Sequence, residues 1–91
     1  MIFEESTHQI IGCAMKVHNK LGFGFQEGIY QRALAIELER ANINFEREKS
    51  IEIYYDEIMI GSRRVDFLVN GKILVELKAV AELDNIHLAQ A

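Results

Sequence analysis

Proline is absent from this chain, and cysteine occurs only once. A single cysteine, Cys13, excludes an intrachain disulfide, and its neighbours Ile10, Ile11, Ala14 and Met15 favour a buried, inert thiol over a reactive one. No apolar run approaches the roughly 18 residues that span a bilayer. The N-terminus also lacks the basic region, apolar stretch and cleavage site of a secretory signal. These absences predict a cytoplasmic protein with no membrane segment.

The composition that is present suits a small globular protein. The 91 residues allow one domain, residues 1–91, and 49% of them are apolar, which argues against disorder. A domain of this size buries a smaller fraction of its surface than a larger one and is marginally stable. The formal net charge of −4 disfavours nucleic-acid binding unless bound cations offset it.

The N-terminal half has the apolar spacing of two helices. Residues 4–20 carry apolar residues at every third or fourth position, which predicts a helix. Gly22 suits the C-terminal cap of this helix because glycine readily adopts the left-handed conformation. A second helix is predicted from about Gln26 to Ala41, with Asn42 ending it.

From Phe45 onward the apolar period changes to two, which is typical of β-strands. Asn70-Gly71 is a strong hairpin signal. The pattern predicts a strand from Phe45 to a turn at Asp56-Glu57, a second from about Ile58 to Val69 with a disturbance at Gly61, and a third from Lys72 to Val80. Asp84 suits the cap of a short helix that begins near Asn85.

This order of elements predicts an α+β fold with two N-terminal helices, a three-stranded, mostly antiparallel meander and a C-terminal helix. The last helix has only about two turns, and isolated helices shorter than about 12 residues are marginal. The sheet also has a free edge. We therefore expect a domain that is incomplete at its C-terminus, or a homo-oligomer in which another copy completes the sheet.

The second and third strands separate their residues by parity. Odd positions such as Val65, Phe67, Val75 and Leu77 are apolar, whereas the even positions include Asp66, Glu76 and Lys78. Neighbouring strands must place their apolar faces on the same side, and residues directly opposite each other point the same way. Paired residue numbers must therefore add to an even total. This places the two acids and the lysine on one face.

Loop length follows from the same argument. A two-residue Asn70-Gly71 loop would give an odd total, so we predict a three-residue loop, Val69 to Gly71, or an equivalent bulge with left-handed glycine. That loop pairs residue 68 with residue 72. It sets Asp66 opposite Leu74 and Glu76 opposite Arg64, with the two acids as diagonal neighbours roughly 7–8 Å apart at the backbone.

Two carboxylates on adjacent strands form a hard oxygen site, which suits Mg²⁺ or Mn²⁺. Such an ion retains several waters, one of which can become a nucleophile, and it can polarise a phosphoryl oxygen. Lys78 could orient that water or stabilise charge that develops on a phosphate. The alternative is a solvated sheet face that carries ordinary charged residues. Leu68, Leu74 and Val80 share this face, which argues against full solvation.

Two sequence motifs resemble a known family. Val65-Asp66, the hairpin and Val75-Glu76-Leu77-Lys78 look like the D…ExK core of the PD-(D/E)XK nuclease superfamily. Upstream, residues 24–30, GFQEGIY, match the pattern that names the GxxExxY protein family, which is assigned to that superfamily. The resemblance covers essentially the whole chain, although members of the family usually continue with more helix and further strands.

The resemblance assigns roles to individual residues. It implies that Asp66 and Glu76 are metal ligands with a catalytic part, that Lys78 is the catalytic lysine, and that Glu27 completes the acidic cluster. Gln90 resembles the glutamine of a helical motif in exonuclease-like relatives. Without the family, Glu27 is equally well explained as an acid that the dipole favours in a first helical turn.

Several residues near these motifs have a structural alternative. Tyr30 lies on the face of the helix that carries Glu27 and is favoured as a core residue over an active-site residue. Arg63 and Arg64 flank the proposed site and could contact phosphate, or could form an ordinary strand-edge charge pair. We treat Arg64 and Gln90 as the candidate substrate contacts.

The first functional hypothesis is therefore a Mg²⁺- or Mn²⁺-dependent nuclease-like domain that hydrolyses DNA phosphodiester bonds. If Glu27, Asp66 and Glu76 hold one divalent cation, the net charge becomes −4 + 2 = −2, and with two cations it is neutral. The second hypothesis is a non-catalytic fragment of the same fold that oligomerises or binds a partner. The sequence does not distinguish DNA from RNA, or endonuclease from exonuclease action.

Overall fold

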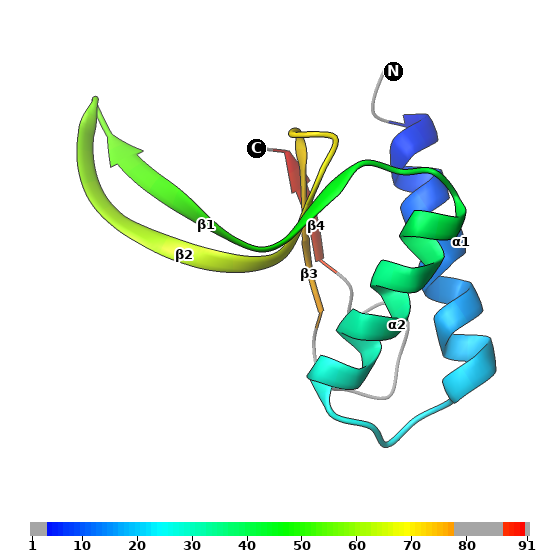
Figure 1. Ribbon diagram of the computed structural model, residues 1–91. Helices are drawn as coiled ribbons and strands as arrows, with labels where there is room; N and C mark the ends of the chain where they lie inside the picture. The colour runs from blue at the N-terminus through cyan, green and yellow to red at the C-terminus, as the bar shows by residue number, and fades with distance from the viewer. Residues whose placement is uncertain (1–3, 78–86, 91) are drawn as a thin grey trace.

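The computed structural model describes residues 4–77 and 87–90, which form two helices followed by one antiparallel sheet. The elements are α1 (Glu4–Leu21), α2 (Glu27–Arg40), β1 (Phe45–Tyr55), β2 (Ile58–Val69), β3 (Ile73–Glu76) and β4 (His87–Gln90). The sheet order is β1-β2-β3-β4. The two helices pack side by side, and the long hairpin of β1 and β2 extends away from them (Figure 1). The predicted α+β class, helix pair and antiparallel meander are confirmed.

Both helices end where the sequence predicts, within one residue. The N–H of Gly22 donates to the carbonyl of His18 at 2.8 Å, and Gly22 has a φ of 73°, so it closes α1 in the left-handed conformation. Ala41 caps α2, and Asn42 follows with a φ of 58°. Neither described helix combines the length and apolarity needed to cross a bilayer.

A buried carboxylate ties α1 to α2. Glu37 is only 6% exposed, and its Oε2 accepts a hydrogen bond from Lys20 Nζ at 2.9 Å. This hydrogen bond lowers the pKa of Glu37 despite the opposing effect of burial, and the positive charges of Lys20, Arg40 and Lys16 lower it further. Cys13, which is buried as predicted, donates from Sγ to the Glu37 carbonyl at 3.6 Å.

The core lies between the helix pair and one face of β2 and β3. The apolar residues of both helices meet the odd positions of the two strands, as the parity argument predicts. The largest fully buried side chains of the core include Phe67, Val69 and Val75 from the strands and Ile10, Leu34 and Leu38 from the helices. Phe45 of β1 packs edge-on against Phe67, with 5.5 Å between ring centroids.

The hairpin of β1 and β2 has the predicted turn and the predicted disturbance. Asp56 and Glu57 form the turn with positive φ values of 47° and 68°. The register changes between Ile53, which pairs with Gly61, and Tyr54, which pairs with Met59. Ile60 is therefore an extra residue, and this β-bulge lies beside Gly61.

Residue numbers paired between β2 and β3 add to an even total, as predicted. The observed total is two higher than the predicted one. Val69 pairs with Ile73 and Phe67 with Val75, so the loop is residues 70–72, not 69–71. In this register Val69 and Ile73 are opposite each other and both are buried. Asn70 and Gly71 take φ values of 54° and 67°, so the glycine is left-handed as predicted.

The predicted C-terminal helix is not found at the described positions. Residues 87–90 form strand β4, which pairs antiparallel with β3 from Glu76–His87 to Ile73–Gln90. The rest of that segment lies outside the described residues. A two-turn helix is marginal alone, whereas the open edge of β3 offers unpaired backbone groups, so strand pairing is favoured here.

Candidate functional site

Asp66 in β2 lies at the junction of α2, β2 and the end of β3. Its Oδ1 accepts a hydrogen bond from Gln31 Nε2 at 2.6 Å, and its Oδ2 accepts one from the backbone N–H of Leu77 at 2.7 Å. The second contact joins Asp66 to the residue that directly follows β3. Asp66 therefore fastens both the helix and the third strand to β2, and it is only partly exposed.

The pairing of β1 with β2 omits one residue pair at Asp66. On the β1 side, pairing runs from Arg47–Phe67 to Lys49–Val65 and omits Glu48, which has a positive φ of 51°. On the β3 side, the described pairing ends at Phe67. The register is unchanged across the omitted pair, and a non-glycine residue in the left-handed conformation, such as Glu48, is a local strain that often lies next to functional sites. This interruption makes Asp66 the structural centre of the candidate site.

Gln31 is a site residue that the sequence analysis missed. It is 8% exposed, its Oε1 accepts a hydrogen bond from Arg47 at 3.1 Å, and its Nε2 faces Asp66. The bond from Arg47 fixes the orientation of the amide, because an arginine can only donate. One signal was available in the sequence: Gln31 is a polar residue on the buried face of α2 that includes Leu34 and Leu38.

Glu76 lies on the strand next to Asp66. The residue numbers of Asp66 and Glu76 add to 142, as do those of the Phe67–Val75 pair. Continuing the register by one residue therefore sets the two acids opposite each other. The predicted diagonal arrangement, with Leu74 opposite Asp66, is therefore corrected. The Glu76 carboxylate forms an ion pair with Arg63, and its side chain is 30% exposed.

Arg64 does not face Glu76, which corrects the predicted pairing. It lies opposite Ser50 of β1, and its guanidinium contacts the Glu48 carboxylate at 3.2 Å, with both side chains exposed. An exposed ion pair of this kind contributes little to stability. Arg63, rather than Arg64, is the arginine in contact with a predicted metal ligand.

Glu27 is exposed in the first turn of α2, one turn before Gln31. Residues four apart share a helix face, so α2 presents Glu27 on the side that meets Asp66 through Gln31. Within residues 4–77 and 87–90, no group of three or more metal-ligating side chains comes together. Glu27 is thus not assembled with Asp66 and Glu76 into a three-acid cluster there.

Two predicted residues fall near or beyond the described part of the chain. Lys78 lies outside the described residues. Gln90 is in β4, where its backbone is opposite Ile73, and not in the predicted helix. Their roles remain predictions.

Tyr30 of the GxxExxY pattern holds the loop between the helices. Its hydroxyl donates to the Gly22 carbonyl at 2.7 Å and accepts from the Phe25 N–H at 3.3 Å. The ring meets Phe25 edge-on and packs against the core. The structural role predicted for Tyr30 is confirmed, and this loop positions the start of α2, where Glu27 lies.

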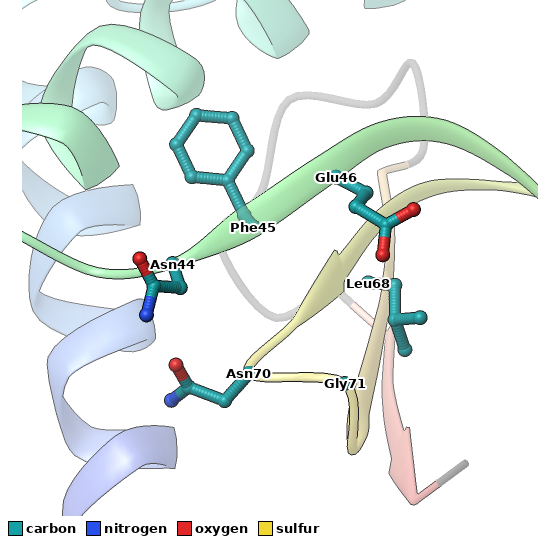
Figure 2. Close-up of a pocket in the computed structure, with 6 residues that line it drawn as sticks. All are labelled: Asn44, Phe45, Glu46, Leu68, Asn70 and Gly71. Atoms are coloured by element: carbon teal, nitrogen blue, oxygen red, sulfur yellow. The ribbon is translucent and has the colours of Figure 1, made fainter.

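A shallow hollow of about 320 Å³ lies beside the β2–β3 turn (Figure 2). Its lining residues are Asn44, Phe45, Glu46, Leu68, Asn70 and Gly71. Glu46 and Leu68 are cross-strand partners and project to one side, whereas Phe45 projects to the other (Figure 2). None of the predicted site residues lines it. Glu46 is its single charged group, so we do not assign the chemistry to this hollow.

The carboxylates of Asp66 and Glu76 can supply hard oxygen ligands from two adjacent positions. Each oxygen of Asp66 accepts one protein hydrogen bond, which leaves lone pairs for a further partner. The 30% exposure of Glu76 lets solvent and small ions reach that side of the junction. The arrangement suits a hydrated divalent cation that takes only one or two protein carboxylates.

Comparison with protein-family models gives one finding. The model of the PD-(D/E)XK nuclease superfamily matches residues 4–91. Neither the curated proteins nor the solved structures give a match. The matched range includes both helices, the four strands and every residue predicted for the site.

Proposed function

The chain belongs to the PD-(D/E)XK nuclease superfamily, and we propose that it is a metal-dependent, cytoplasmic nuclease-like domain that hydrolyses DNA phosphodiester bonds. We also place it in the GxxExxY group, because Gly24, Glu27 and Tyr30 have that spacing. The observation that carries the proposal is the position of Asp66. It lies where the β1–β2 pairing omits one residue pair, and the β2–β3 register, continued by one residue, sets it opposite Glu76.

The residues present fit Mg²⁺ or Mn²⁺. Asp66 and Glu76 would hold the ion through carboxylate oxygens, and Glu27 would complete the acidic set from the exposed first turn of α2. When bound, such an ion activates a water molecule and polarises a phosphoryl oxygen. Gln31 and the Leu77 N–H would keep the Asp66 carboxylate in a fixed orientation during this process.

The remaining roles concern the phosphate. Lys78, two residues beyond Glu76, would orient the attacking water or stabilise negative charge on the phosphoryl oxygens. Arg64 and Gln90 are proposed to contact the substrate backbone, and Arg64 would exchange its exposed partner Glu48 for a phosphate. In the reaction, a water molecule gives up a proton and its oxygen forms a bond to phosphorus. The bond between phosphorus and the leaving sugar oxygen breaks, and that oxygen receives a proton.

A second candidate function is a non-catalytic module of the same fold that oligomerises or binds a partner. Two observations favour it. Arg63 already neutralises the Glu76 carboxylate, and the hairpin of β1 and β2 carries exposed apolar residues that a catalytic site does not require. Under this proposal the described chain would be one part of a larger assembly.

Calorimetric titration with Mg²⁺ and with Mn²⁺ tests the metal site. We expect binding by the wild type and a large loss of affinity in Asp66→Ala and in Glu76→Gln. Asp66→Ala also removes two structural hydrogen bonds, so Glu76→Gln provides the variant that keeps the junction intact. Glu46→Gln, an exposed acid outside the junction, is the matched control and should bind normally. Equal binding by all four proteins would overturn the proposed site.

Catalysis is tested separately from metal binding. Linear duplex DNA and single-stranded RNA of matched sequence would be incubated with the wild type and with Lys78→Ala in Mg²⁺. The proposal expects DNA cleavage by the wild type and at least about a hundredfold loss in Lys78→Ala, with metal affinity retained. Metal binding without cleavage of either substrate would support the non-catalytic module instead.

A further inference from the structure

Arg47 in β1 differs from the other basic residues of the β1–β2 hairpin. The other three each form an ion pair with a carboxylate: Lys49 with Glu46, Arg63 with Glu76 and Arg64 with Glu48. Arg47 is exposed, and its guanidinium donates to the neutral amide oxygen of Gln31 at 3.1 Å. Within residues 4–77 and 87–90, no carboxylate forms an ion pair with Arg47. The hairpin therefore carries one cation that the described acids do not neutralise.

The backbone of β1 directs Arg47 toward α2. Side chains alternate between the two faces of a strand, so Arg47 shares the face of Phe45, which packs against the core. The acids on either side of Arg47 in the chain are held elsewhere. Glu46 projects to the other side from Phe45 (Figure 2), and Glu48 takes the left-handed conformation, with a φ of 51°, and contacts Arg64. The two acids nearest in sequence therefore leave Arg47 to Gln31.

Gln31 separates Arg47 from Asp66. Its Oε1 accepts the hydrogen bond from Arg47, and its Nε2 donates to Asp66 Oδ1 at 2.6 Å. Arg47 Nη2 and Asp66 Oδ1 therefore lie no more than about 8 Å apart, given the bond lengths of an amide. A direct ion pair would have cancelled both charges. The buried amide instead holds the cation beside the proposed metal ligand and leaves each of them able to bind a further partner.

The donors of Arg47 suit a phosphate. A guanidinium has five N–H donors in a planar fork, and Gln31 accepts from one nitrogen of Arg47. The fork matches two oxygens of a phosphate, and charge-assisted hydrogen bonds of this kind are strong. Because Gln31 already restricts the side chain, Arg47 loses less conformational freedom when it binds. A chain with a net charge of −4 needs such an unneutralised cation where a polyanion approaches.

We propose that Arg47 is a phosphate-binding residue of the substrate site, which Gln31 positions beside Asp66 so that it contacts a phosphodiester group of the DNA backbone. This inference rests on the proposed nuclease function and adds to it a substrate contact outside the sequence motifs. Arg47 holds the strand and takes no part in breaking the bond. A backbone contact carries no sequence information, so its loss weakens binding to every sequence alike.

Fluorescence anisotropy of a labelled DNA duplex measures this contact without cleavage. Binding would be followed over a range of salt concentrations in EDTA and, in parallel, in Ca²⁺, which carboxylates also bind. We expect Arg47→Met to weaken binding about tenfold at about 0.1 M salt and to reduce the slope of log affinity against log salt by about 0.9, as the loss of one phosphate contact requires. A purely structural role for Arg47 would leave that slope unchanged.

Two further variants separate the charge of Arg47 from its structural contact. Arg47→Lys keeps the positive charge but not the planar fork, so it should retain the wild-type salt slope and lose less affinity than Arg47→Met. Lys16→Met is the matched control, because it removes the same charge from an exposed position of α1 near Glu37, and it should bind DNA like the wild type. Circular dichroism and urea denaturation check that each variant retains the fold.

The outcomes distinguish this inference from the nuclease proposal. If the wild type binds DNA and Arg47→Met leaves the salt slope unchanged, this inference is overturned and the nuclease proposal stands. If binding depends on Arg47 but the wild type cleaves no DNA in Mg²⁺, this inference is supported and the catalytic proposal is overturned. If the wild type binds no DNA in either EDTA or Ca²⁺, both are overturned.

Discussion

Gln31 in α2 donates a hydrogen bond of 2.6 Å to Asp66 in β2, which joins two residues 35 positions apart in the chain. Arg47 of β1 holds the other end of the same amide at 3.1 Å. One buried side chain thereby connects the helix layer to two strands at the position where the ladder is interrupted. The contact is structural in the protein as it stands, and in the proposed nuclease it also orients a metal ligand.

Replacing Gln31 by leucine tests the structural part of this contact. Gln31→Leu removes a donor from Asp66 and an acceptor from Arg47 in a partly buried setting, and we expect it to lower the free energy of unfolding by about 1–3 kcal/mol. Urea denaturation would measure the change. Arg32→Leu, at the exposed position next along the helix, should change stability by no more than about 0.5 kcal/mol. Equal stability of the two variants would contradict this role for Gln31.

The Tyr30 hydroxyl provides a second prediction. Tyr30→Phe keeps the ring against the core and removes only the hydrogen bonds to the Gly22 carbonyl and the Phe25 N–H. We expect a loss of about 0.5–1.5 kcal/mol and faster amide hydrogen exchange across residues 22–26. Tyr54→Phe, which alters an exposed tyrosine in the hairpin of β1 and β2, serves as the control. Unchanged exchange in the loop would show that the hydroxyl does not hold it.

The lowered pKa of Glu37 predicts a pH dependence of stability. The hydrogen bond from Lys20 favours the carboxylate, so its stabilising contribution is complete above the ordinary carboxyl pKa. This contribution is lost as the pH falls through the lowered pKa of the folded protein. Glu37→Gln should therefore reduce thermal stability at neutral pH and flatten its decline on acidification.

Thermal denaturation between about pH 2 and pH 7 would measure this effect. Glu39→Gln, an exposed acid in the same helix, is the control and should leave the profile close to that of the wild type. A Glu37→Gln profile parallel to the wild-type profile at every pH would contradict the assignment.

Cys13 should resist alkylation in the folded chain. Burial raises the pKa of its thiol. The positive charge of Lys16 opposes this shift, and the negative charge of Glu37 adds a smaller contribution that raises the pKa. Less thiolate is therefore present at mildly alkaline pH. We expect slow reaction with iodoacetamide until the chain is denatured. A Cys13→Ala/Met15→Cys variant moves the thiol to an exposed position of α1 and should react rapidly. If the folded wild type and this folded variant reacted with iodoacetamide at similar rates, Cys13 would have to lie at the surface.

The sequence predicted the helices, the hairpin and the parity of the strands because these depend on local patterns. The apolar residues Val65, Phe67 and Val69 alternate with other residues along β2. This alternation requires that the residue numbers paired between β2 and β3 add to an even total, and the observed pairs do. Parity does not distinguish totals that differ by two. The choice between them depends on where the turn places Asn70 and Gly71, and the predicted register therefore differed from the observed one by two residues.

The contacts around Asp66 could not be predicted in the same way. The bond from Gln31 depends on how α2 lies against the sheet, and that position follows from core packing between residues distant in the chain. Strand β4 shows the same limit, since the four residues at 87–90 suit a helical turn or a short strand equally well. The open edge of β3 decides between these, and no local pattern records it.

Asp66 fastens α2 and the end of β3 to the same strand, so its chemistry and its architecture are inseparable. An attempt to redesign this domain as an ion-binding protein cannot begin by exchanging that aspartate, because α2 and the end of β3 would lose their shared attachment to β2. Glu27, exposed on the adjoining turn of α2, offers the freer starting point: its side chain can be varied while the scaffold stays closed.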